Sequence, residues 1–271
     1  MILSSKSKKL KVLIGIAIGC GIVGSVTALN GWFGAGAKIP EDTFTRGLVA
    51  YWSFDEGKGD TAYDLSGNGN HGAIYGAKWV KGKFGTALRF DGVDDYVEVP
   101  YLDVFNQKEF TVVAWVWRDA IKLYEPIFSI ADGYETDRYL HCMSKNGNPY
   151  LGFWADDLRS STKLELNRWY HLVFVWEGPT TKKQIIYING RKDCERTSTG
   201  LLTVTSGAVT GNGGWIGRFA GEFHNGLIDE VRIYNRALTE EEIRYLYNKG
   251  KPDHQWRFEE GEGSTAYDSG K

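Results

Sequence analysis

The sequence predicts an all-β protein, a two-sheet antiparallel sandwich with one short helix near the C-terminus and one apolar helix near the N-terminus. Short runs of alternating apolar and polar residues follow one another from Gly47 onward. Gly, Asn and Asp separate these runs about every eight to twelve residues, a spacing typical of sandwiches and barrels. Aromatic residues make up 14% of the chain. That share is enough to fill a sizeable core and excludes a wholly disordered chain.

The first element is an apolar segment, 12–29, which follows a basic leader, 1–11, with four lysines and no acidic residue. An uncharged helix of this length, at about 1.5 Å per residue, just spans a hydrocarbon core of about 30 Å. The basic flank predicts a transmembrane anchor with the N-terminus inside. The alternatives are a cleaved signal peptide with Val26 and Ala28 before the cleavage site, or lipidation at Cys20. All three export the rest of the chain, so we expect an extracellular or cell-surface domain.

A glycine-containing spacer, 30–46, leads to the predicted sandwich domain, 47–250. The strongest predicted strand is 110–117, because it is almost entirely apolar and rich in valine and tryptophan. Asp91 and Gly92 predict a hairpin turn between two of the shorter strands. Further strands are predicted at 48–54, 87–90, 96–99, 126–130, 139–144, 150–154, 169–176, 184–189, 215–217 and 227–234.

A single short helix is predicted to follow Thr239. Thr239 and Glu242 have the spacing of a capping box, in which each side chain bonds the backbone N–H of the other residue. Three acidic residues in the first turn favour the positive end of the helix dipole. Gly250 is expected to end the helix. Its apolar face is predicted to consist of Ile243, Leu246 and Tyr247.

The opening of the domain is repeated near the end of the chain. Residues 51–64 recur as 255–268, with three matching aromatic residues and two matching glycines. A copy this short cannot bury a core of its own. Residues 251–271 are therefore interpreted as the start of a second, truncated repeat of a tandem-repeat surface protein.

The predicted domain contains six motifs, at residues 47–56, 64–72, 85–97, 169–174, 186–190 and 226–238. In this order they resemble the laminin-G-like, concanavalin A-like jelly roll. The resemblance implies two packed antiparallel sheets, export, structural calcium, and binding of glycans or proteins. Function varies widely among proteins with this fold, so the fold alone does not name the ligand.

On this resemblance, Asp64, Asn68 and Asp229 are the candidate calcium ligands. The family's calcium site joins a glycine-rich loop to the Ile-Asp-Glu stretch near the end of the domain. Calcium takes several oxygen ligands at about 2.3–2.6 Å, and this loop is rich in such oxygens. The alternative is that Asp64 caps a turn and that Asp229 binds backbone amides which fix the last strand. Asp94 and Asp95 are interpreted as solvated turn acids, with a second cation site as the alternative.

A ligand groove is predicted where an aromatic residue and two carboxylates follow a strand, because an aromatic face can stack on a sugar ring while carboxylates bond its hydroxyls. An earlier loop reaches the same end of the sandwich. His141 and Trp117 are expected to join the groove if they face the concave sheet. The alternative is that each residue is structural. The candidate ligand-binding residues are Trp154, Asp156, Asp157, Tyr134 and Asp137.

Cys142 and Cys194 are the only cysteines outside the apolar segment. Outside the cytoplasm such a pair forms a disulfide if the two strands are neighbours, so a disulfide is predicted, with two free thiols as the alternative. No set of Cys and His residues has the spacing of a zinc site.

The net charge of −2, with four lysines in the leader, leaves a mildly acidic domain and excludes nucleic acid as a partner. Catalysis is not expected, because no predicted strand carries the alternating carboxylates of a glycosidase. A Gly-x-Ser-x-Gly motif is absent as well. The leading hypothesis is a membrane-anchored module that binds a glycan or a cell-surface protein and is stabilised by calcium. The alternatives are a structural spacer domain and a glycoside hydrolase.

Overall fold

The computed structural model describes residues 42–130, 139–153, 155–204 and 213–248. All of them belong to one compact unit, Gly36–Lys271. The predicted anchor, 12–29, and the predicted second repeat, 251–271, lie outside the described residues. Within the described ranges, no helix combines the length and the apolar character that a membrane span requires.

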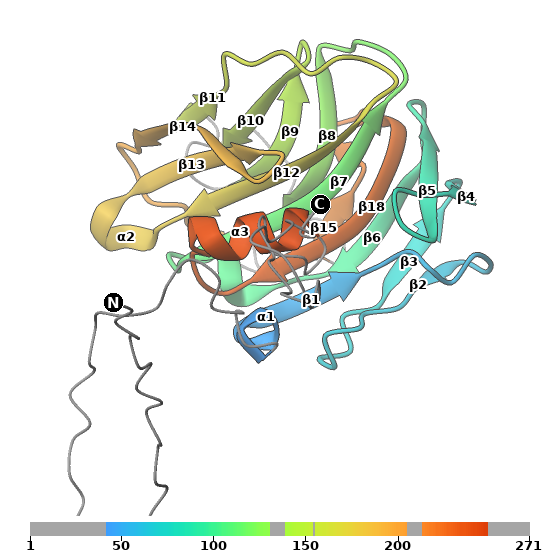
Figure 1. The fold of residues 1–271 in the computed structure, drawn as a ribbon, viewed down its shortest axis with the longest axis horizontal. Helices are drawn as coiled ribbons and strands as arrows, with labels where there is room; N and C mark the ends of the chain where they lie inside the picture. The colour runs from blue at the N-terminus through green and yellow to red at the C-terminus, as the bar shows by residue number, and fades with distance from the viewer. Residues whose placement is uncertain (1–41, 131–138, 154, 205–212, 249–271) are drawn as a thin grey trace, which may run out of the picture. The chain divides into compact units, whose positions relative to one another are not determined.

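Within the described residues, two antiparallel β-sheets of eight strands each form the domain (Figure 1), and the sequence predicts such a two-sheet architecture. The architecture is consistent with a jelly-roll sandwich. In the first sheet the order is β14 (Arg191–Thr197), β13 (Lys183–Ile188), β12 (Trp169–Trp176), β7 (Phe110–Arg118), β18 (Asn225–Tyr234), β5 (Thr86–Asp91) and β4 (Lys78–Lys81), and β1 (Leu48–Trp52) also pairs with β18. In the second sheet the order is β11 (Asp157–Arg159), β10 (Asn148–Gly152), β9 (Leu140–Lys145), β8 (Tyr124–Ile130), β15 (Gly213–Ile216), β6 (Tyr96–Pro100), β3 (Gly72–Tyr75) and β2 (Thr61–Ala62).

The remaining elements are small. Among the described residues, a short hairpin lies beside the second sheet, and four short helices lie before the first strand, in connections or at the end of the domain. The hairpin consists of β16 (Arg218–Phe219) and β17 (Glu222–Phe223), and the helices are α1 (Asp42–Thr45), the 3-10 helix η1 (Asp103–Phe105), α2 (Gly178–Thr181) and α3 (Glu240–Tyr247).

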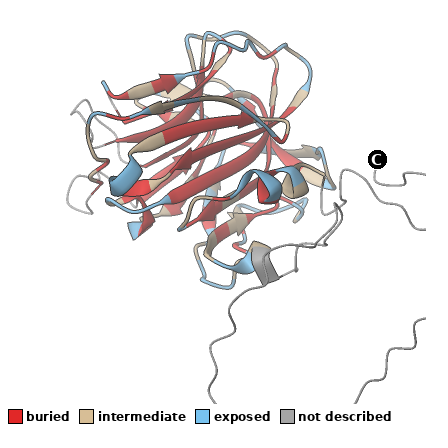
Figure 2. Ribbon diagram, turned by 60° about the vertical axis from the view of Figure 1, so that its left-hand side comes forward, coloured by how far each residue is buried: buried red, intermediate tan, exposed pale blue. Residues whose placement is uncertain are grey.

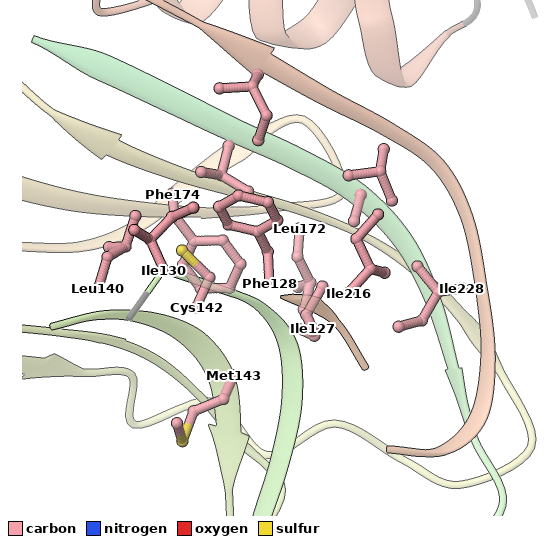
Figure 3. Close-up of a cluster of buried hydrophobic side chains, with 14 of the residues drawn as sticks. Ile127, Phe128, Ile130, Leu140, Cys142, Met143, Leu172, Phe174, Ile216 and Ile228 are labelled. Atoms are coloured by element: carbon pink, nitrogen blue, oxygen red, sulfur yellow. The ribbon is translucent and has the colours of Figure 1, made fainter. Parts of the chain in front are cut away.

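The hydrophobic core lies between the two sheets, because alternate residues of each strand point to the same face. Buried residues run along the central strands (Figure 2). Phe128 and Cys142 from the second sheet meet Leu172 and Phe174 from the first sheet in this layer (Figure 3). Met143 points away from the layer in the same view. The residue after Cys142 therefore faces the other side of the second sheet, which is where the candidate site lies.

The outer face of the first sheet is covered by α3. Ile243 of α3 is fully buried in a second apolar cluster, together with Val113 of β7 and Val173 of β12. The predicted capping box is confirmed, with Thr239 Oγ1 accepting from the N–H of Glu242 and the N–H of Thr239 donating to Glu242 Oε2. Strand β7 is therefore buried on both faces, which explains why its sequence is continuously apolar.

The predicted hairpin at Asp91 and Gly92 is wrong. Strand β5 pairs with β4 and β18 in the first sheet, whereas β6 pairs with β3 and β15 in the second. Asp91 does cap a tight turn, since its Oδ1 accepts from the N–H of Val93 at 2.8 Å. The turn chemistry was visible in the sequence, but it carries the chain from one sheet to the other. Turn residues fix a reversal of direction and do not fix which strands pair.

The strands that the sequence analysis did not anticipate are short or lie at the sheet edges. Strand β14 is the clearest case, because its seven residues are mostly polar and partly exposed. Polar side chains are common on edge strands, where they discourage pairing with other chains. They also remove the apolar alternation on which the predictions depended.

The predicted disulfide between Cys142 and Cys194 is not formed, and both are free thiols. Cys142 lies on β9 of the second sheet, whereas Cys194 lies on β14 at the edge of the first sheet. Strands of two packed sheets stand roughly 10 Å apart. A disulfide requires Cα atoms within about 4.4–6.8 Å. Their strands are therefore not neighbours.

Candidate functional site

A pocket of about 450 Å³ lies on the outer face of the second sheet. On β9, Leu140 and Cys142 face the core, so the intervening side chains face outward into this pocket. The hairpin β16–β17 and the loop before β11 form the remaining walls. The lining residues are Tyr124, His141, Met143, Lys145, Tyr150, Ala155, Asp157, Phe219, Ala220 and Glu222.

His141 belongs to the floor of the pocket. Its ring stacks on Tyr150, with centroids 5.5 Å apart and planes 15° apart, and it also contacts Phe219 at 4.7 Å. Gly152 lies directly opposite His141 in the β9–β10 pair. Burial, and then the nearby Lys145 ammonium, lower the pKa of His141 to about 3. His141 is therefore an uncharged ring at neutral pH.

Two tyrosines form an aromatic wall around Lys145. The Lys145 Nζ lies 5.1 Å from the ring centroid of Tyr124 and 5.4 Å from that of Tyr150. The three residues come from neighbouring strands, because β9 lies between β8 and β10. Ammonium groups are attracted to aromatic faces at such distances. The wall therefore combines apolar surface with a site for positive charge.

Two carboxylates from distant parts of the sequence line the same pocket. Asp157 begins β11, and its Oδ1 accepts from the N–H of Phe153 at 3.1 Å and lies 3.7 Å from His141 Nε2. Burial, followed by a hydrogen bond to Asp157, raises the pKa of the Tyr150 hydroxyl. Glu222 is half-buried in β17 on another wall. The pocket therefore offers several hydrogen-bonding groups beside aromatic faces.

Asp156 does not line this pocket, contrary to the sequence-based prediction. Its side chain is 1% exposed and is held by donors from the first sheet's edge. Burial raises the pKa of Asp156, but hydrogen bonds, the strongest from Ser198, outweigh burial and lower it. Asp156 therefore fixes the loop that presents Asp157. Its oxygens accept from Arg196 Nη2 at 2.8 Å, from the Ser198 hydroxyl, and from the N–H groups of Thr199 at 2.9 Å and Gly200 at 2.8 Å.

The other predicted ligand residues have different outcomes. Trp154, Tyr134 and Asp137 lie outside the described residues. Trp117 lies in the first sheet, where its Nε1 donates to Asp119 Oδ1 at 2.9 Å, and it does not line the pocket. Lys145 was not among the predicted ligand residues, although the alternation of β9 places it on the same face as His141. Glu222 had no such signal, because its hairpin is too short to show a period.

Asp64 has the role of a turn cap. Its Oδ1 accepts from the N–H groups of Tyr51 and Ser66, and its Oδ2 accepts from the N–H of Asn70 and the Ser66 hydroxyl. Burial raises the pKa of Asp64, but these hydrogen bonds outweigh burial and lower it. The side-chain amide of Asn68 donates to the backbone carbonyls of Leu48 and Val49. A cation at Asp64 would have to replace hydrogen bonds that already satisfy both oxygens.

Asp229 is a better fit to a cation. It is fully buried in β18, and its Oδ2 accepts from the N–H of Phe84 at 3.1 Å. Its Oδ1 has no hydrogen-bond partner within the described residues. Burial, and then the charge of Glu230, raise the pKa of Asp229 to about 7. An unpaired buried carboxylate oxygen is the kind of group that a bound cation or a proton neutralises.

Within the described residues, neither Asp64 nor Asp229 belongs to a group of three His, Cys, Asp or Glu residues whose ligand atoms lie close together. Across the described ranges, one set of three such residues has ligand atoms within 4.8 Å of one another, and it consists of Asp91, Asp94 and Asp95. Asp91 and Asp94 are exposed, and Asp91 already caps the turn. The exposure of Asp94 agrees with its interpretation as a solvated turn acid. The same interpretation is wrong for Asp95, which is buried and whose Oδ2 accepts from the N–H of Asp91 at 2.9 Å.

Comparison with solved structures finds the same fold in several proteins. Domain 4 of AbnA, an extracellular GH43 arabinanase from Geobacillus stearothermophilus in complex with arabinotriose, is 21% identical, with a TM-score of 0.58, over 74% of this chain and 98% of that chain. The binding domain of Paraclostridial Mosquitocidal Protein 1 is 19% identical, with a TM-score of 0.57, over 75% of this chain and 52% of that chain. Trypanosoma rangeli sialidase is 21% identical, with a TM-score of 0.56, over 74% of this chain and 33% of that chain.

This chain thus spans about half the length of the second structure and a third of the third. At such identities the likeness shows the fold alone. No curated protein matches the sequence.

The prediction that the protein is not an enzyme is wrong, because this fold does not exclude enzyme activity. Solved structures with this fold include an arabinanase and a sialidase, and the matching family includes glucanases. Asp157 and Glu222 line the same pocket although they come from separate segments of the chain. A search for paired carboxylates on one strand cannot detect such an arrangement. A family model matches residues 91–244, which make up more than half of this chain. The chain therefore belongs to the concanavalin A-like lectin/glucanases superfamily.

Proposed function

We propose that the protein binds a glycan in the pocket on the outer face of the second sheet. The observation that carries this proposal is the placement of the Tyr124 and Tyr150 rings beside the Asp157 carboxylate in one cavity. The faces of sugar rings are rich in C–H groups and pack on aromatic rings, while carboxylates accept hydrogen bonds from sugar hydroxyls. The volume of about 450 Å³ falls within the range of small-molecule sites, about 300–1,000 Å³.

The comparisons support a carbohydrate ligand. The arabinanase domain of the same fold was solved with arabinotriose, and it matches along almost all of its length. The family description also names lectins and glucanases. These findings support glycan binding in general and do not identify the sugar.

A glycan array, followed by calorimetric titration with arabinotriose and with each sugar that the array detects, tests this proposal. Asp157→Asn and Tyr150→Ala are expected to weaken binding at least tenfold, about 1.4 kcal/mol. Asp60→Asn is the matched control, because Asp60 is an exposed acid that does not line the pocket. Absence of binding on the array and in titration would favour the spacer function. Equal loss in the control would place the binding elsewhere.

Glycoside hydrolysis is a second candidate function, because Asp157 and Glu222 line one cavity. Two carboxylates on opposite sides of a glycosidic bond are the usual machinery of such enzymes. The release of reducing ends from a glycan that binds on the array measures hydrolysis. Hydrolysis that disappears in both Asp157→Asn and Glu222→Gln would support it, whereas binding without turnover would leave only the binding function.

We also propose a structural calcium ion at Asp229, supported by its unpaired Oδ1 and by the nearby charges of Glu230 and Asp55. Calcium bound to the native state alone raises the melting midpoint by mass action. The midpoint should rise with calcium, fall with chelator, and respond to neither in Asp229→Asn. Asp64→Asn should destabilise the domain equally with and without calcium, because Asp64 holds its loop by hydrogen bonds. An unchanged midpoint in the parent protein would eliminate the ion.

Membrane anchoring through residues 12–29, with the domain at the cell surface, is likewise a proposal supported by the uncharged segment and its four preceding lysines. Fractionation of cells that express the full chain tests it. Recovery in the membrane fraction after a high-salt or alkaline wash is expected, and recovery in the soluble fraction would exclude an uncleaved anchor.

A further inference from the structure

The position of Lys145 suggests which class of ligand the pocket prefers. Its ammonium lies over the faces of both Tyr124 and Tyr150, at 5.1 and 5.4 Å from the ring centroids. Aromatic faces carry the negative part of the ring quadrupole, and pairs of such faces hold ammonium and quaternary ammonium groups in ligand sites. The two rings therefore already solvate a cation that belongs to the protein itself.

The charges around this cation are unbalanced. Asp157 and Glu222 line the pocket, and Lys145 is the one cation among its described lining residues at neutral pH. His141 adds no charge, because burial holds its pKa far below 7. When the Lys145 ammonium leaves the rings, the pocket contains two carboxylates, two aromatic faces and no positive charge. Such a cavity attracts a cation.

The Lys145 ammonium can move away from the two tyrosine rings. Lys145 is half-buried at the end of β9, and its long flexible side chain lets the ammonium reach solvent without a change in the backbone. The tyrosines are fixed on β8 and β10, and the Tyr150 ring also stacks on the buried His141. The Tyr150 ring is therefore held by a packed neighbour, whereas Lys145 can change its side-chain rotamer.

We propose that the pocket selects ligands that carry an ammonium group, such as an amino sugar, and that Lys145 is an internal competitor that occupies the ammonium position in the free protein. The proposal rests on the proposed function, since it concerns the same pocket. A ligand ammonium displaces the Lys145 ammonium and lies against both tyrosine rings, where Asp157 and Glu222 balance its charge. Lys145 therefore lowers the affinity for cationic ligands.

A pocket that binds an acidic sugar would respond to the loss of Lys145 in the opposite way. If Lys145 instead bound an acidic sugar, its removal would weaken binding, and the ligand's negative charge would face Asp157 and Glu222. The sign of the effect of Lys145→Met on affinity therefore separates the two. Methionine keeps most of the side chain's volume and removes its charge.

The experiment titrates the full chain, in detergent, with choline and with 3,3-dimethylbutan-1-ol, an uncharged molecule of the same shape, and follows binding by NMR and calorimetry. Choline should bind about tenfold more tightly than its uncharged counterpart. Lys145→Met should increase the affinity for choline about threefold to tenfold, and Asp157→Asn should decrease it. Lys108→Met, at an exposed lysine that does not line the pocket, should change neither affinity. Thermal melting verifies that each variant is folded.

Glucosamine and glucose, which differ by one protonated amine, repeat the comparison on a sugar ring. The proposal is overturned if choline and the uncharged molecule bind equally, if neither binds, or if Lys145→Met weakens choline binding. Failure of the proposed function has a different signature. If glycan binding is wrong, choline binds as described but no glycan binds. If only the ammonium preference is wrong, a neutral or acidic glycan binds, and its binding depends on Asp157 and Lys145.

Discussion

Gly152 leaves the space that His141 occupies. The two residues face each other across the β9–β10 pair, and a Cβ atom on residue 152 would lie 1.8 Å from His141 Nε2. Any side chain at 152 therefore displaces the imidazole ring, which stacks on Tyr150 and forms the pocket floor. The absence of a side chain at one position thus shapes the candidate site.

The first prediction follows from this contact. Gly152→Ala should destabilise the domain by about 1–3 kcal/mol, the usual cost of overpacking a well-packed site, and should weaken ligand binding. Urea unfolding measures the stability. The double variant Gly152→Ala with His141→Ala is the control, because removal of the ring relieves the clash. If the double variant is no more stable than the sum of the two single changes implies, the clash is not the cause.

The second prediction concerns the hydrogen bonds that hold the Asp156 side chain. Asp156→Asn keeps the size of the side chain but weakens its bonds to Arg196, Ser198 and two backbone amides. We expect a loss of about 1–3 kcal/mol in unfolding free energy and weaker ligand binding, because Asp157 loses its fixed position. Asp157→Asn should instead weaken binding with little change in stability. Equal effects of both variants on stability would contradict these separate roles.

The third prediction is a pH dependence of stability from Asp229. Its pKa is about 7 in the folded protein, against 3.8 as the ordinary value. Between these values the folded state binds the extra proton, so the unfolding free energy should fall as the pH rises from about 4 to about 7, by roughly 1.4 kcal/mol per pH unit at most. Asp229→Asn should lack this component. Urea unfolding from pH 4 to 9 in the presence of chelator, which removes the proposed calcium ion, measures the difference, and parallel profiles of variant and parent would refute it.

The fourth prediction concerns acid sensitivity at His171. This residue is buried beneath α3, where its ring lies 5.1 Å from Trp115 and 5.8 Å from Tyr247. Burial, and then the charge of Arg232, lower the pKa of His171 to about 3, against 6.5 as the ordinary value. The unfolded state therefore binds the proton first, and stability should fall as the pH drops below about 6.5.

His171→Gln should reduce this acid sensitivity, although the loss of the ring contacts lowers stability at neutral pH. The fluorescence of the tryptophans during acid titration reports the transition. An acid midpoint that is the same in variant and parent would show that His171 does not contribute. His141 and His224 are also buried with lowered pKa values, so the effect should be reduced and not abolished.

Local sequence determined the elements whose stability depends on nearby residues. The capping box at Thr239 and Glu242 specified where α3 begins, because both of its hydrogen bonds join residues three apart. The alternation along β9 likewise placed His141 and Lys145 on one face, since successive side chains of a strand point to opposite sides. The two-sheet sandwich follows from such patterns.

Only the tertiary structure decided which of these faces and turns meet. It sent the chain from β5 to β6 across the two sheets, separated Cys142 from Cys194, and turned Asp156 inward beside Asp157. It also brought Glu222 into the pocket from a hairpin with no periodic signal. The physical reason is that a period of two residues states which side chains share a face, whereas the choice of neighbouring strands depends on packing between segments far apart in the sequence.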